Sequence, residues 1–163
     1  STYKLTDLLG GSFVTELGAF GLWGETFWSI NTGQTNGELT LGMDHTFNNG
    51  IYTMIEGFHN SFGADQQHLQ SDHYLNYFSG ETKSLMQNYL FGMAGKPINN
   101  FISTNIMAFG NLDDSSFILA PGLEWEGFED VIFSVFTGFS FGESESEFGI
   151  QDKNFRIRLR AYF

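Results

Sequence analysis

The chain of 163 residues has the length of a single domain, with 19 Phe, 20 Gly and only 7 Lys and Arg against 19 Asp and Glu. Its net charge of −12 argues against a nucleic-acid partner, because binding to phosphates requires Lys and Arg. The absence of Cys excludes disulfides, thiol nucleophiles and thiolate metal sites.

Apolar and polar residues alternate along most of the chain, and no convincing helical period is present. In the segment Glu38–Phe47, for example, Leu39, Leu41 and Met43 share one side of an extended strand, because alternate side chains point to the same face. The alternation predicts nine strands: Phe13–Phe20, Thr26–Ile30, Glu38–Phe47, Ile51–Ser61, Ser84–Gly95, Phe101–Asn111, Phe117–Trp125, Val131–Gly142 and Phe155–Phe163.

The connections between these strands separate into two groups. Counted back from the C-terminus, both long connections, Phe62–Lys83 and Glu143–Lys153, fall at one end of the strands together with Thr32–Gly37 and Leu112–Ser115. Only short connections fall at the other end: Gly21–Gly24, Asn48–Gly50, Lys96–Asn100 and Glu126–Glu129. This pattern predicts one all-β domain over residues 1–163, folded as an antiparallel up-and-down transmembrane β-barrel of about eight to ten strands.

The last nine residues combine an apolar face with a cationic face. Apolar residues occupy every second position and end on an aromatic residue: Phe155, Ile157, Leu159, Ala161 and Phe163. The segment resembles the C-terminal signal strand of bacterial outer-membrane β-barrels. The resemblance implies a porin-like protein of the outer membrane, in contact with its lipids and lipopolysaccharide, with a periplasmic C-terminus and extracellular long connections. It also implies that the barrel-assembly machinery recognises Phe155–Phe163.

The strand number leaves two alternatives open. Bacterial barrels usually have an even number of strands, whereas nine are predicted here. A tenth strand could come from Tyr3 to Leu9, although Thr6-Asp7 interrupts that segment. Alternatively, the chain is the C-terminal part of a larger barrel, and further strands, a partner chain or a homo-oligomer completes it.

Charged residues on the polar face are the candidate pore lining. Arg156, Arg158 and Arg160 are the only Arg in the chain, and alternation places them on one face of the final strand. The carboxylates expected on the same lumen face are Glu16, Asp44, Glu56 and Glu124. We interpret the two sets as lining a passive pore for ions or small polar solutes, without a reaction or a cofactor. The alternative is a small barrel filled by salt bridges, with a structural or surface-interaction role through Phe62–Lys83 and Glu143–Lys153.

Two other groups carry weaker signals. His59 and Ser61 lie two residues apart, so a strand would place an imidazole and a hydroxyl on one face. The outer-membrane phospholipase and lipid A deacylase families use a similar His-x-Ser, but the sequence shows no partner that would orient His59. A divalent metal could bind in the longest connection, where the ligand-like residues are Asp65, His68, Asp72 and His73.

Overall fold

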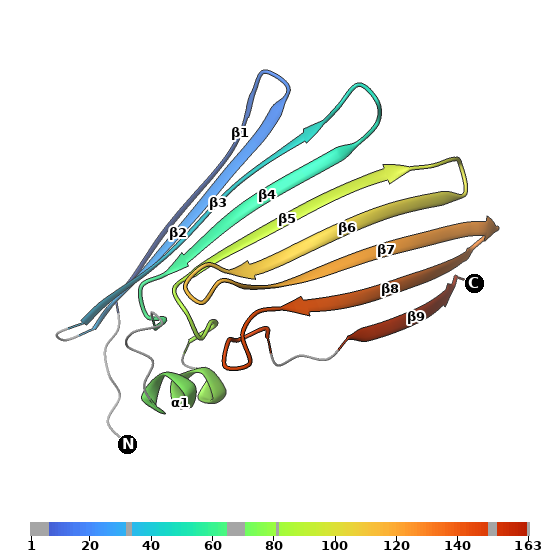
Figure 1. Cartoon of the computed structure of the whole chain (residues 1–163). Helices are drawn as coiled ribbons and strands as arrows, with labels where there is room; N and C mark the ends of the chain where they lie inside the picture. Colours follow the sequence, from blue (N-terminus) through green and yellow to red (C-terminus); the bar gives the residue numbers. More distant parts are fainter. Residues whose placement is uncertain (1–6, 32–33, 65–70, 81, 150–152, 163) are drawn as a thin grey trace.

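The computed structural model describes residues 7–31, 34–64, 71–80, 82–149 and 153–162. These form one antiparallel sheet of nine strands in which each strand pairs with its neighbours in sequence (Figure 1). The predicted all-β up-and-down topology is therefore confirmed. The strands are β1 (Asp7–Leu17), β2 (Phe20–Asn31), β3 (Gln34–Thr46), β4 (Tyr52–Asn60), β5 (Asn88–Pro97), β6 (Ile102–Asn111), β7 (Ser116–Phe128), β8 (Val131–Phe141) and β9 (Asn154–Ala161).

The first hairpin differs from the prediction. Its turn lies at Gly18-Ala19, where Gly18 has a φ of 65°, and not at Gly21–Gly24. Both of those glycines lie inside β2, where a side chain would collide with cross-strand neighbours: Asp44 at Gly21, and Phe13 and Leu41 at Gly24. These glycines therefore allow the neighbouring side chains to pack closely against β2, and they do not interrupt the strand. The predicted connection Thr32–Gly37 is also shorter, because β3 begins at Gln34.

Helix α1 (Ser71–Ser79) lies within the connection between β4 and β5 and was not predicted. None of its residues is buried, so the helix has no packed face that would impose a helical period on its apolar residues. Among the described residues, no helix is both long and apolar enough to cross a membrane.

The strand register divides the sheet into an apolar face and a polar face. The apolar face contains cross-strand pairs such as Met43–Ile55 and Leu123–Val135. Among its paired residues, the only Asp, Glu, Lys or Arg are Asp7 and Lys96, which lie at opposite ends of their strands. Large side chains remain exposed on this face, among them Leu41 at 50% and Leu159 at 69%. Such an extended apolar surface is characteristic of a face that meets another apolar phase.

The buried core lies on the polar face, at the end of the sheet where the long connections fold over it (Figure 1). Tyr89 of β5 and Phe148 of the β8–β9 connection are buried together with Met86 of the β4–β5 connection. Ala64 and Leu85 complete the cluster, and Phe58 and Ile118 pack against it. The two long connections therefore cover one end of the polar face.

The sheet is open. Strands β1 and β9 form its opposite edges, and every described residue of both strands is exposed. Because nine alternating strands place β1 and β9 in the same direction, antiparallel closure would require an odd number of additional strands. Of the segment Tyr3–Leu9, considered as a tenth strand, Asp7–Leu9 belong to β1, and residues 1–6 lie outside the described part of the chain.

Candidate functional site

The seven charged residues predicted to line a lumen lie on the polar face. Arg158 pairs with Ser134, which in turn pairs with Glu124, and the flanking Arg156 and Arg160 share the face of Arg158. Glu16 and Asp44 both pair with Gly21, and Glu56 pairs with Gly42, which is two residues from Asp44. The register therefore gathers Glu16, Asp44 and Glu56 on β1, β3 and β4, and places the arginines at the opposite edge of the sheet.

Neutral neighbours hold these carboxylates. Glu56 accepts a hydrogen bond from the Trp23 indole at 2.8 Å, and Asp44 accepts one from the Tyr52 hydroxyl at 3.0 Å. Glu124 accepts one from the Ser134 hydroxyl at 3.0 Å. These hydrogen bonds fix the positions of the carboxyl groups on β3 and β4.

The arginine side chains are exposed and make few contacts. Arg160 donates a hydrogen bond to the Tyr162 hydroxyl at 3.1 Å. Among the described residues, the ion pair observed joins Lys83 to Glu38 at 3.1 Å, and none joins a carboxylate to Arg156, Arg158 or Arg160. The salt-bridged filling considered from the sequence is therefore not formed by these arginines within the described chain.

His59 has an orienting partner that the sequence did not reveal. Its Nδ1 lies 2.8 Å from Oδ1 of Asn88, which is paired with it on β5. The Asn88 amide donates through Nδ2 to Asp113 at 2.7 Å. Because a carboxylate only accepts, Asn88 presents its oxygen to His59, so Nδ1 of His59 carries the hydrogen of this contact; only in the neutral imidazole is Nε2 then an acceptor. The two residues are 29 positions apart, and the intervening connection conceals their pairing.

Ser61 continues the β3–β4 pairing opposite Gly37. Its amide donates to the Gly37 carbonyl at 2.9 Å, and the Gly37 amide donates to the Ser61 hydroxyl at 2.7 Å. Ser61, two residues after His59, thus lies just beyond the end of β4, and its hydroxyl takes the place of a backbone carbonyl in the pairing with Gly37. No hydrogen bond joins the two side chains in the described structure, so a catalytic contact would require rotation of one of them.

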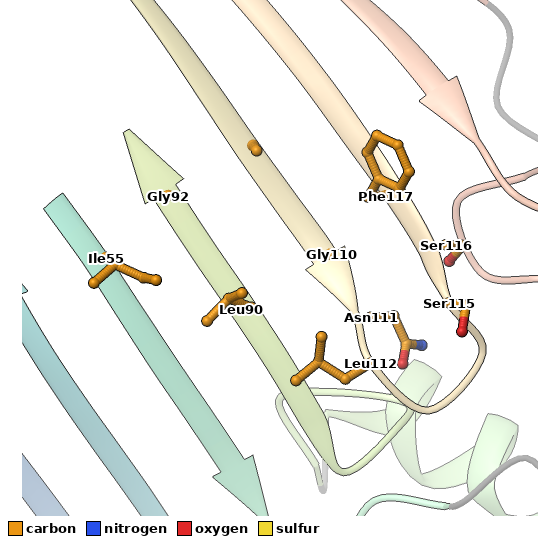
Figure 2. Close-up of a pocket in the computed structure, with 10 residues that line it drawn as sticks. Ile55, Leu90, Gly92, Gly110, Asn111, Leu112, Ser115, Ser116 and Phe117 are labelled. Atoms are coloured by element: carbon orange, nitrogen blue, oxygen red, sulfur yellow. The ribbon is translucent and has the colours of Figure 1, made fainter. Parts of the chain in front are cut away.

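A groove on the apolar face lies close to His59 and Asn88. Figure 2 shows its lining, in which Ile55, Leu90 and Phe117 surround Gly92 and Gly110. The groove has a volume of about 400 Å³. Open space remains above Gly92, where an added Cβ would meet nothing within 4 Å. Glycines among large apolar residues thus create a depression of a size that an alkyl chain can enter.

A second pocket, of about 230 Å³, lies on the polar face beneath the long connections. We call it the loop pocket. Its walls come from three strands, from α1 and from both connections, and its lining residues are Phe58, Tyr77, Lys83, Ser84, Tyr89, Phe109, Glu147 and Phe148. Alternation along the strands predicts which face Phe58, Tyr89 and Phe109 occupy. The lining residues from the connections reach the pocket only because the connections fold back over the sheet.

The metal interpretation receives no structural support. Asp65 and His68 lie outside the described residues, and Asp72 and His73 lie in α1. Among the residues that are described, no group of three or more His, Asp or Glu gathers as a metal site.

No protein-family model, curated protein or solved structure matches the chain. Its class is therefore defined by the fold alone. The described part of the chain is all-β, built from one open up-and-down sheet of nine strands with one apolar and one polar face.

Proposed function

We propose that the chain forms the wall of a bacterial outer-membrane β-barrel that acts as a passive pore for ions or small polar solutes. The apolar face carries this proposal, because Asp7 and Lys96 are the only Asp, Glu, Lys or Arg among its paired residues in the described chain. A sheet with such a face suits a hydrocarbon environment, where an unpaired charge is costly. The exposed Leu, Ile and Phe side chains would then contact lipid rather than water.

The polar face would line the pore. Its arginines on β9 and its carboxylates on β1, β3 and β4 occupy opposite parts of the sheet and are not neutralised by mutual contact. Charges separated in this way would favour the passage of polar solutes over apolar ones. The proposed pore uses no reaction and no cofactor.

The proposed orientation places the C-terminus in the periplasm and the long connections at the cell surface, near lipopolysaccharide. Barrel-assembly machinery would recognise Phe155–Phe163. The open edges at β1 and β9 require completion, because unpaired backbone groups are unfavourable in lipid. Further strands, from a partner chain, from another copy or from a longer protein, would provide it.

The pore is tested by ion currents across a planar bilayer that contains the refolded protein. We expect discrete openings, and Arg158→Glu should shift the permeability ratio toward cations. An interaction of about 1 kcal/mol with one lining charge corresponds to about a fivefold change in that ratio. The control Lys153→Glu makes the same charge change before β9 and should have little effect. A folded, inserted protein without currents would contradict the pore and favour a structural barrel.

A second candidate function, hydrolysis of a lipid ester, is favoured by the chain of contacts from His59 through Asn88 to Asp113. The Ser61 oxygen would attack the ester carbonyl, while its proton passes to His59 Nε2 and then to the leaving alcohol. Water would then hydrolyse the acyl-serine and release a carboxylic acid. The groove beside Leu90 would hold the acyl chain.

The hydrolase is tested by fatty-acid release from phospholipid vesicles. We expect Ser61→Ala to abolish release and His59→Ala to slow it by about 10²–10⁴-fold, the usual contribution of a general base. Ser12→Ala, on the polar face of β1, is the matched control and should retain full activity. Equal release by the wild-type protein and Ser61→Ala would eliminate this candidate.

A further inference from the structure

We propose that the loop pocket binds a small organic cation, an ammonium group that carries apolar substituents. The juxtaposition of five aromatic rings with the side chain of Glu147 carries the proposal. Binding itself depends only on the folded polar face. A role for the bound cation at the mouth of a pore would rest on the proposed function.

Aromatic rings form most of the pocket wall and are packed against one another. The rings of Tyr89 and Phe109 are stacked, with centroids 5.5 Å apart. Phe148 lies 5.4 Å from Phe109, and Phe58 lies 6.3 Å from Tyr89. The negative face of an aromatic ring attracts ammonium groups, and several rings around one cavity add their contributions. The walls therefore offer both apolar contact and favourable electrostatics to a cation.

Glu147 supplies the carboxylate. Its Oε2 accepts hydrogen bonds from the Tyr89 hydroxyl and from Asn111 Nδ2, each at 2.8 Å. Its backbone amide donates to Asp114 at 2.8 Å, which fixes the residue over the sheet. Both hydrogen bonds that its side chain makes to described residues involve Oε2. This arrangement fixes the position of the carboxyl group in the pocket wall.

The charges around Glu147 favour a cationic ligand. Asp113 and Asp114, in the connection between β6 and β7, act electrostatically on Glu147 and add negative potential. Lys83 also lines the pocket, but its side chain is 76% exposed and its ammonium is bonded to Glu38 at 3.1 Å. The remaining lining residues with a polar ring substituent, Tyr77 and Tyr89, carry phenol hydroxyls and add no cationic group. The net field of the pocket is thus negative.

Binding should depend on pH through Glu147. Burial raises the pKa of this carboxyl above its usual value, and the charges of Asp114 and Asp113 raise it further, although the hydrogen bonds from Tyr89 and Asn111 act in the opposite direction. A cation prefers the deprotonated form. Its affinity should therefore increase as the pH rises through the Glu147 pKa and decrease as the pH falls below it.

Choline is a suitable probe because its quaternary ammonium keeps its charge at every pH. The uncharged carbon analogue, 3,3-dimethylbutan-1-ol, has nearly the same shape. Calorimetric titration of the refolded chain in detergent should show choline binding at least about tenfold more tightly than the analogue. Glu147→Gln should reduce the choline affinity by about tenfold and leave that of the analogue unchanged. Equal affinities of the wild-type protein for the two compounds would overturn the proposal.

Glu145→Gln is the matched control, because Glu145 is an exposed carboxylate of the same connection. It should leave choline binding unchanged, and an equal loss in both variants would also overturn the site. If Glu147→Gln disturbs folding, the choline affinity of the wild-type chain is measured over a series of pH values instead. A choline affinity independent of pH would contradict a role for Glu147. Choline binding without ion currents would support the cation site and contradict the proposed pore. Ion currents without choline binding would support the pore and contradict the cation site.

Discussion

In the proposed membrane wall, replacement of Leu41 by arginine is expected to destabilise the sheet by about 2–4 kcal/mol, because the proposal places Leu41 on the lipid face near the membrane midplane. Leu41 lies in the middle of β3 on the apolar face, where its cross-strand partners are Gly24 and Gly57. No carboxylate of the described chain shares this face near Leu41, so the new guanidinium would have no partner. The free energy of unfolding from lipid vesicles, measured by urea titration, reports the effect.

Thr40→Arg is the matched control for this variant. Thr40 precedes Leu41 on β3 but lies on the polar face, where Glu25 is its partner on β2. An arginine there would be close to a carboxylate and to water, and the change in free energy should be within about 1 kcal/mol. Equal destabilisation by the two variants would show that the two faces do not meet different environments.

The second large effect is expected from Asn60→Ala, at the end of β4. Asn60 is 2% exposed, and its Nδ2 donates to Thr82 at 3.0 Å and to Ser84 at 2.9 Å. Its Oδ1 accepts from the Phe62 amide at 3.0 Å. Loss of these three bonds, each contributing about 1 kcal/mol, together with the small cavity that results, should destabilise this end of the sheet by about 2–4 kcal/mol.

Protease cleavage in the connection between β4 and β5 measures this effect, because the bonds of Asn60 hold both ends of that connection. Cleavage should accelerate in Asn60→Ala. Asn49→Ala provides the comparison, since Asn49 is exposed and its side chain accepts one hydrogen bond, from the Ile51 amide at 3.2 Å. Unchanged cleavage in Asn60→Ala would mean that Asn60 does not anchor the connection.

The strands could be predicted from the sequence because alternation is a local property. The period of two in β3 identifies Leu39 and Leu41 as neighbours on one face, whatever the rest of the chain does. The same period placed Arg158 and Glu124 on the other face, where both flank Ser134. Neither conclusion required knowledge of the connections.

The missed features depend on contacts between distant segments. Gly21 and Gly24 resembled a break in a strand, yet they make room for the side chains of Asp44, Phe13 and Leu41 on the adjacent strands. The partnership of Asn88 with His59 requires the register between β4 and β5, which a long connection containing α1 leaves undetermined from sequence.

The loop pocket shows the same limit. Phe58, Tyr89 and Phe109 fall on one face by alternation, but nothing local indicates that Glu147 and Phe148 fold back over them. The position of Glu147 follows from its bonds to Tyr89 and Asn111, which belong to different strands. The runs of Glu and Ser in this connection instead suggest a solvated loop when the sequence is read alone.

The most direct test of a membrane wall with one lipid face and one water face is thiol labelling along β3 in lipid vesicles. The chain has no cysteine, so each introduced cysteine is the only reactive thiol. A membrane-impermeant, water-soluble reagent should label cysteines at Thr40 and Asp44 and spare those at Leu39, Leu41 and Met43. Equal labelling at Thr40 and Leu41 in the folded, inserted protein would contradict the two-faced membrane sheet.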